Sequence, residues 1–120
     1  MEFSNMNFTE PDLSHSYSGL YRDTVLRLAY SVNKMSYDGE YELTTETYEL
    51  RDDDSKFIDV HIAENSDGFA EIEVCGSIVT EKEVAEVYQR SAMNVSSDDF
   101  DDVRGKMLAD AYGYMAMFIW

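Results

Sequence analysis

The chain has 120 residues, and its 25 Asp and Glu outnumber its 9 Lys and Arg, which gives a formal net charge of -16 at pH 7. This length is typical of one domain, and 44% apolar residues are enough for one hydrophobic core. Such a charge repels polyanions, which excludes broad binding to nucleic acid or to an acidic membrane surface. We therefore expect a single domain over residues 1–120, with no direct nucleic-acid or membrane partner.

The cysteine and histidine content bounds the compartment and the cofactors. Cys75 is the single cysteine, so an internal disulfide is excluded, and it cannot form a structural zinc site with only 2 histidines. The N-terminus lacks the basic and apolar regions of a secretory signal, and the longest apolar stretch, 112–120, is too short to span a bilayer. These features predict a cytoplasmic protein without metal or cofactor. Adaptation to high salt is an alternative explanation of the acidity.

The hydrophobic pattern predicts elements in chain order. Residues 1–17 show no sustained period and are expected to form an irregular lead-in. From 18 to 35 the apolar residues recur every three or four positions, which predicts a helix that ends at the turn 37–39. Alternating patterns then predict three strands within 40–50, 56–63 and 69–75, joined by tight turns.

Two further helices are expected after the strands. Thr80 and Glu83 have the spacing of a capping box, which predicts a short helix through Ser91. Ser96 or Ser97 is expected to cap the last helix, whose first turns are rich in Asp. Its expected buried stripe is Phe100, Val103, Met107, Ala111, Tyr114 and Phe118.

The predicted order α-β-β-β-α-α indicates an α+β fold, a three-stranded antiparallel meander with helices packed on one face. This order contains the α-β-β-β-α succession of double-stranded RNA-binding domains. Those domains need basic residues where this chain has Glu81, Glu83 and Glu86, or a run of Asp. We therefore assign no RNA-binding residue.

One face of the predicted meander is mostly acidic. Strands lie about 4.8 Å apart and alternate residues roughly 6.5 to 7 Å apart, so these carboxylates form a grid comparable in spacing to the phosphates of a nucleic acid. Ordinary solvation of the face is the alternative, but few lysines interrupt the acids and like charges destabilise a sheet. The expected partner-binding residues are Glu40, Glu42, Glu46, Asp59, Glu71 and Glu73 on the sheet, Asp52, Asp53 and Asp54 at its edge, and Asp98, Asp99, Asp101 and Asp102 at a helix start.

In size and charge the chain resembles the acidic nucleic-acid mimics by which phages inhibit restriction enzymes and CRISPR effectors. The resemblance rests on composition. It implies a small, phage-encoded, non-enzymatic inhibitor in the host cytoplasm. Carboxylates would replace phosphates in the groove of a basic nucleic-acid-binding protein and sterically block its DNA or RNA.

Metal binding and catalysis are weaker interpretations. The acidic runs 52–54 and 98–102 do not fit a calcium loop, because neither has Gly at the sixth position or Glu at the twelfth. No catalytic motif surrounds His15, His61 or Cys75, and nearby acids raise the pKa of a thiol. We expect no enzyme and no metal site.

The C-terminal segment 112–120 is apolar on nearly every side. We expect it to be a core helix on the sheet. Alternatively, Met115, Ile119 and Trp120 form the seam of a homodimer, which would lengthen the anionic surface. The alternative function, from a different class, is a dimeric adaptor or chaperone-like module that holds a partner segment with this helix.

Overall fold

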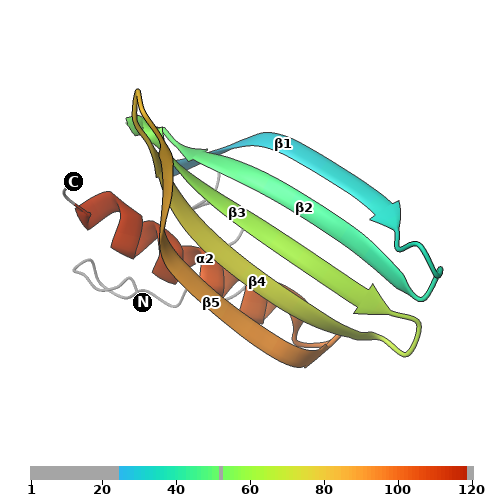
Figure 1. Ribbon diagram of the computed structural model, residues 1–120. Helices are drawn as coiled ribbons and strands as arrows, with labels where there is room; N and C mark the ends of the chain where they lie inside the picture. The colour runs from blue at the N-terminus through green and yellow to red at the C-terminus, as the bar shows by residue number, and fades with distance from the viewer. Residues whose placement is uncertain (1–24, 52, 119–120) are drawn as a thin grey trace.

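The computed structural model describes residues 25–51 and 53–118. In this part of the chain, five antiparallel strands are hydrogen-bonded in sequence order, and helix α2 follows them. The sheet curves around α2, which lies along one of its faces (Figure 1). The elements are β1 (Leu26–Met35), β2 (Tyr41–Leu50), β3 (Asp53–Asn65), β4 (Phe69–Val79), β5 (Val84–Ser96) and α2 (Phe100–Met117).

Alternation of apolar and polar residues gives the sheet two different faces. In β3, Ile58 and Val60 are fully buried, whereas the intervening Asp59 and the following His61 are at least partly exposed. Successive side chains of a strand project to opposite sides, so this pattern buries one face only. We call the face that packs against α2 the inner face, and the opposite one the outer face.

The core lies between the inner face and α2. The helix packs chiefly against β3, β4 and β5. Leu108, Ala111 and Met115 of α2 are fully buried there. Gly76 of β4 allows a close approach, because a Cβ built on it would lie 2.5 Å from the Met115 sulfur. This contact fixes which side of α2 faces the sheet.

The predicted fold class is wrong, because the described residues form a five-stranded sheet with one C-terminal helix and no three-stranded meander. The strands predicted within 40–50, 56–63 and 69–75 and the last helix are confirmed, as β2, β3, β4 and α2. The predicted helix 18–35 is wrong over 26–35, and the predicted helix after Thr80 is wrong as well; both errors have a local cause. The predicted lead-in 1–17 and residues 18–24 lie outside the described residues.

The segment predicted as the first helix contains β1. It pairs with β2 along its length, with a bulge between Leu28 and Tyr30. Three of the apolar residues that suggested a buried helix face, Leu28, Val32 and Met35, are exposed instead, with exposed fractions of 50%, 38% and 58%. Over residues 26–35, the three-to-four spacing therefore did not indicate an amphipathic helix.

The predicted short helix after Thr80 is β5. The Thr80 hydroxyl accepts a hydrogen bond from the Glu83 amide at 3.2 Å, as in a capping box. The Thr80 amide, however, donates to the Glu83 carbonyl at 2.8 Å, which closes the tight connection between the antiparallel strands β4 and β5. The same side-chain hydrogen bond is therefore compatible with a hairpin connection as well as with a helix start.

Among the described residues, no helix is long and apolar enough to cross a membrane.

Candidate functional site

Three connections meet at one end of the sheet: the β1–β2 turn, the β3–β4 turn and the link from β5 to α2 (Figure 1). The Ser97 amide in the link donates to the Gly68 carbonyl in the β3–β4 turn at 3.0 Å. Glu40 and Asp67 line a shared hollow of about 410 Å³ between the two turns. None of the three connections contains Lys or Arg. The carboxylates of the three connections therefore lie at one end of the sheet, and no Lys or Arg within these connections balances their charge.

The β1–β2 turn holds its carboxylate by local hydrogen bonds. The Ser36 hydroxyl donates to Asp38 at 2.7 Å and the Glu40 amide donates to Asp38 at 3.0 Å. The turn needs a left-handed residue, and Gly39 supplies it with φ of 75°. The Ser36 hydroxyl, followed by the Glu40 amide, lowers the pKa of Asp38 below its usual value. Asp38 is therefore fully charged near neutral pH.

The start of α2 adds carboxylates to this end. Asp101 and Asp102 lie in the first turn, where the helix dipole favours negative charge. Asp99 is the N-cap residue, but its side chain makes no capping hydrogen bond. The Ser96 hydroxyl donates to Asp99 at 3.2 Å, so the prediction that Ser96 or Ser97 is the N-cap is wrong.

The pairing of β2 with β3 places two like charges side by side. Glu42 lies directly opposite Glu64, which is an unfavourable cross-strand pair. Both residues line one hollow with Glu40 beside the β1–β2 turn. We call the carboxylates at this end of the sheet the acidic end. It consists of Asp38, Glu40, Glu42, Glu64, Asp67, Asp98, Asp99, Asp101 and Asp102.

Three members of the acidic end were not predicted from the sequence: Asp38, Glu64 and Asp67. Asp38 and Asp67 were interpreted only as residues of tight turns, and Glu64, which lies beside the second turn, was assigned no role. In an antiparallel meander, however, every second turn lies at the same end of the sheet. That rule would have brought these residues together with Glu40 and Glu42.

Exposed aromatic and apolar side chains lie beside the acidic end. Tyr37 is fully exposed at the tip of the β1–β2 turn, and Met35 and Tyr41 flank that turn with exposed fractions of 58% and 36%. Tyr and Met are enriched in the contact surfaces of protein complexes. This end therefore combines charge with side chains suited to anchoring a partner.

The outer face carries some of the predicted acids. Asp59, Glu71 and Glu73 project from it, as the alternation predicted. The Thr47 hydroxyl donates to Asp59 at 2.7 Å, and the Gln89 amide group donates to Glu73 at 2.8 Å. Two of these three carboxylates thus accept cross-strand hydrogen bonds from the sheet itself.

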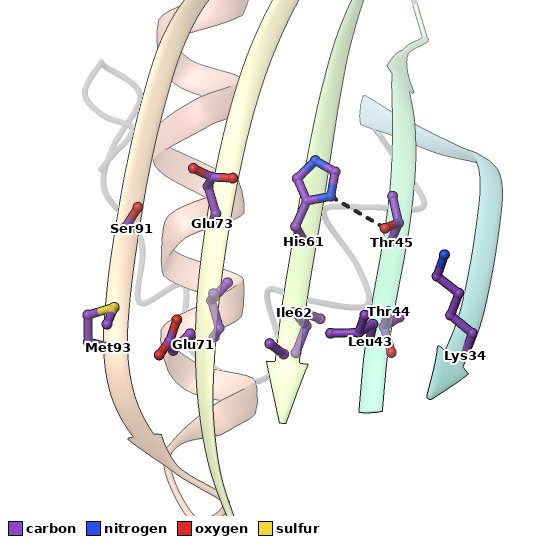
Figure 2. Close-up of a pocket in the computed structure, with 12 residues that line it drawn as sticks. Lys34, Leu43, Thr44, Thr45, His61, Ile62, Glu71, Glu73, Ser91 and Met93 are labelled. Carbon is purple, nitrogen blue, oxygen red and sulfur yellow. Dashed lines mark hydrogen bonds between the residues drawn. The ribbon is translucent and has the colours of Figure 1, made fainter. Parts of the chain in front are cut away.

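A shallow hollow of about 390 Å³ lies on the outer face and is lined by residues of all five strands (Figure 2). Lys34 lies on the β1 side, and Glu71 and Glu73 lie on the β4 side. His61 lies between them, with its Nδ1 atom 3.4 Å from the Thr45 hydroxyl oxygen. The hollow therefore combines both charges, unlike the acidic grid expected for this face.

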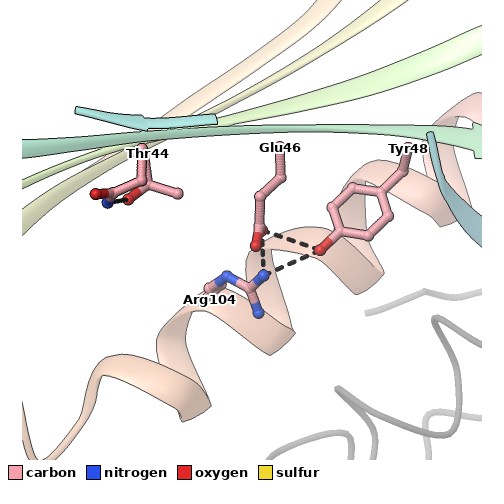
Figure 3. A network of polar contacts seen from close by, with 5 residues as sticks. Thr44, Glu46, Tyr48 and Arg104 are labelled. Atoms are coloured by element: carbon pink, nitrogen blue, oxygen red, sulfur yellow. Dashed lines mark hydrogen bonds and ion pairs between the residues drawn. The ribbon is translucent and has the colours of Figure 1, made fainter. Parts of the chain in front are cut away.

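Glu46 lies on the inner face, in contrast to the prediction for the solvated face. It is opposite the buried Val60 and is paired with the Arg104 guanidinium of α2 (Figure 3). The Tyr48 hydroxyl donates to Glu46 at 2.9 Å and accepts from Arg104 at 3.0 Å. Burial lowers the pKa of Arg104, but Tyr48 and Glu46 more than offset this and hold the pKa above its usual value. Glu46 is thus an internal structural residue.

Two of the predicted edge acids, Asp53 and Asp54, lie at the end of the sheet opposite the acidic end. Asp53 accepts from the Ser55 hydroxyl at 2.6 Å and forms an ion pair with Lys56 at 3.3 Å. The Ser55 hydroxyl is the main cause that lowers the pKa of Asp53. Asp54 is exposed, and Asp52 lies outside the described residues. These acids are separated from the acidic end by the length of the strands.

The predicted dimer seam is not available at Met115. This side chain is fully buried against Gly76 of β4 and belongs to the core. Ile119 and Trp120 lie outside the described residues. The structure therefore gives no support to a seam or partner groove built on Met115.

Cys75 lies on the outer face among acidic side chains. Burial, together with the nearby Glu86, Glu73 and Asp59, raises the pKa of its thiol to about 12. A neutral thiol is a poor nucleophile. Within the part of the chain that the structure describes, no group of three or more His, Cys, Asp or Glu could hold a metal ion.

Comparisons with known proteins do not assign the chain to a family. No family model matches it, and no curated protein and no solved structure matches it either. Its function therefore has to be argued from its own residues.

Proposed function

We propose that this chain is a small non-enzymatic inhibitor that binds a basic nucleic-acid-binding protein through the acidic end and sterically blocks DNA or RNA. The observation that carries the proposal is the convergence of carboxylates from three connections that contain no Lys or Arg. Such a surface is complementary to a groove lined by Arg and Lys, where each carboxylate takes the place of a phosphate.

The acidic end has an energetic reason to bind cations. The adjacent Glu42 and Glu64 repel each other, and a bound guanidinium placed between them would remove that repulsion. The net charge of -16 would also speed association with a basic partner and make it salt-sensitive. Tyr37 would supply an aromatic anchor within the charged contact.

The same reasoning places the contact away from most of the outer face. There, Asp59 and Glu73 accept hydrogen bonds within the sheet, and Lys34 adds a positive charge. The proposed inhibitor acts by occupation and needs no reactive group, which agrees with the raised pKa of Cys75. A free cysteine suits the cytoplasm of a phage-infected host, where we place its action.

The experiment compares two variants with equal change in charge. In the acidic-end variant Glu40, Glu42 and Glu64 become Gln and Asp67 becomes Asn. In the control variant the same number of exposed carboxylates elsewhere are neutralised, namely Asp54, Glu81, Glu83 and Glu86. Each protein is used to capture partners from host lysate, and the captured protein is then tested for binding to labelled DNA or RNA.

We expect the wild type and the control variant to capture the same basic protein and to displace its nucleic acid, and the acidic-end variant to lose both activities. Higher salt should weaken the capture, because the contact is between opposite charges. Capture and displacement by the acidic-end variant at wild-type strength would refute the proposal. So would a captured protein that binds its nucleic acid and this chain together.

A further inference from the structure

Strand β1 is exposed on both faces. Every residue from Arg27 to Met35 is solvent-exposed, although the strand contains large apolar side chains. Leu28, Tyr30 and Val32 have exposed fractions of 50%, 58% and 38%. Large apolar side chains gathered on one strand mark a contact surface more often than isolated ones do.

The backbone of β1 is also open on one side. It is an edge strand in the described sheet and pairs only with β2 there. Alternate amide and carbonyl groups of an edge strand point away from its neighbour and are free to pair with another strand. The bulge between Leu28 and Tyr30 interrupts regular pairing, so the continuous free edge covers residues 30–35.

The charge of β1 differs from that of the rest of the molecule. It is the only strand or helix in the described residues without an Asp or Glu. Arg27 forms an ion pair with Glu49 of β2, while Lys34 has no ion pair with any described residue. Two copies of so acidic a chain repel each other, and β1 is the element at which they can approach with the least repulsion.

We propose that β1 is the contact between two copies of this chain, paired antiparallel across a two-fold axis. Outer-face residues must then lie opposite outer-face residues, because the sheet continues from one copy into the other. A register centred on Val32 places it opposite its own equivalent and places Tyr30 opposite the partner's Lys34. The unpaired ammonium group thereby lies beside an aromatic ring, and no like charges face each other.

This arrangement is compatible with the acidic end. Antiparallel β1 strands direct the two β1–β2 turns in opposite directions, so the acidic ends project from opposite sides of the joined sheet. The contact is short compared with stable interfaces, which bury roughly 1,200 to 2,000 Å². We therefore expect a weak dimer that forms at high protein concentration.

The first test is sedimentation velocity over a concentration series. Val32→Asp sets two carboxylates opposite each other at the axis and should weaken the dimer at least tenfold. Met93→Asp is the matched control, because Met93 is equally apolar and 63% exposed but lies on β5, at the other edge. We expect this control to dimerise like the wild type. Circular dichroism of both variants is the check that each of them is folded.

The second test examines the register with cysteine pairs in a Cys75→Ser background. Directly opposite residues of an antiparallel pair have Cβ atoms about 4.5 to 5.5 Å apart, which is close to disulfide geometry. Val32→Cys should therefore form a disulfide-linked dimer under mild oxidation. Ser31→Cys, which would lie opposite the partner's Asn33, should cross-link much more slowly.

Salt separates this proposal from the inhibitor proposal. Screening reduces the repulsion between two acidic copies, so higher salt should strengthen the dimer, whereas it should weaken binding to a basic partner. A chain that stays monomeric at all concentrations in high salt would overturn the dimer. Equal dimerisation of the wild type and Val32→Asp, or equal cross-linking of the two cysteine variants, would also overturn it.

Discussion

Replacement of Arg104 by Met should destabilise the fold more than any single change of a surface charge. Arg104 and Glu46 have side chains only 9% and 16% exposed, so the loss of the guanidinium leaves a carboxylate that is poorly solvated. Removal of one partner of a buried ion pair costs about 3 to 5 kcal/mol. Because water reaches both groups slightly, we expect the lower end of that range. For a chain of this size, that loss lowers the melting temperature by roughly 12 °C.

A double-mutant cycle separates the ion pair from the loss of packing. Replacement of both Arg104 and Glu46 by Met removes both charges and keeps similar volume, so we expect the double variant to be within about 1 kcal/mol of the wild type. Arg90→Met is the control, because Arg90 is exposed: its guanidinium lies over the Tyr88 ring, 5.2 Å from its centroid, and donates to the Gln89 carbonyl at 3.2 Å. We expect that change to cost at most about 1 kcal/mol.

The assay is urea unfolding followed by far-ultraviolet circular dichroism. The unfolding midpoints and slopes of the wild type, both single variants, the double variant and the control give the coupling free energy directly. A loss below about 0.5 kcal/mol for Arg104→Met would refute the assignment of a desolvated ion pair. A double variant as unstable as Arg104→Met would show that packing of the Arg104 side chain, rather than its charge, stabilises this position.

Three further changes test the core, the thiol and the acidic end. Gly76→Ala should lower the free energy of unfolding in urea by about 1 to 3 kcal/mol, because the added Cβ would lie 2.5 Å from the Met115 sulfur. In a Met115→Val background the same change should cost less. An unchanged free energy of unfolding for Gly76→Ala would contradict the close approach. Cys75 has a pKa raised from 9.0 to about 12, so the folded protein should react with iodoacetamide at pH 9 far more slowly than the urea-unfolded protein. Its folded pKa is the higher one, so its contribution to stability should be complete below pH 9 and decline as the pH rises toward 12; equal labelling rates would count against this burial. Glu64→Lys replaces the repulsion between residues 64 and 42 by an attraction, so it should raise the free energy of unfolding by up to about 1 kcal/mol at low salt and by less at high salt. An unchanged unfolding midpoint at low salt would contradict the pairing of Glu64 with Glu42.

Strands with strict alternation could be predicted from the sequence, and strands without it could not. In β3 and β4 the helix α2 covers one face, so the pattern of Ile58, Val60 and their polar neighbours repeats every two residues. In β1 nearly every position is exposed, and burial therefore selects no period. Leu28 and Val32 happen to be four residues apart, which is also a helical spacing.

For a related reason, the sequence could not predict which side of α2 contacts the sheet. Its apolar residues lie on nearly every side, so their spacing does not indicate which side contacts the sheet. Ala111 was correctly expected to be buried, but Tyr114 is 42% exposed, and the contact is made instead by Met115 with Gly76. The fit of the Met115 side chain over Gly76 determines which side of α2 faces the sheet, and the spacing of apolar residues in the sequence does not show this fit.

The candidate site could be predicted only in part. The sequence identified Asp98, Asp99 and Glu40 as members of an acidic surface, and the structure brings them to one end of the sheet. Glu46 was assigned to the wrong face because the alternation of β2 was given the wrong phase. Glu42 and Glu46 project to the same side of the sheet as the buried Tyr48, which is the side of α2, whereas Asp59 projects to the other side. Its partner Arg104 lies 58 residues away along the chain, and only the packing of α2 on the inner face of the sheet brings the two together.

The position of α2 has a mechanical consequence for the acidic end. The helix packs chiefly beneath β3, β4 and β5, so the outer part of the β1–β2 hairpin is held mainly by hydrogen bonds within the sheet (Figure 1). Amide hydrogens of β1 should therefore exchange with solvent well before those of β4. One half of the acidic end is anchored to the helix, and the half on the hairpin is compliant. Twisting of the hairpin alone would then move the carboxylates on the hairpin relative to those at the start of α2.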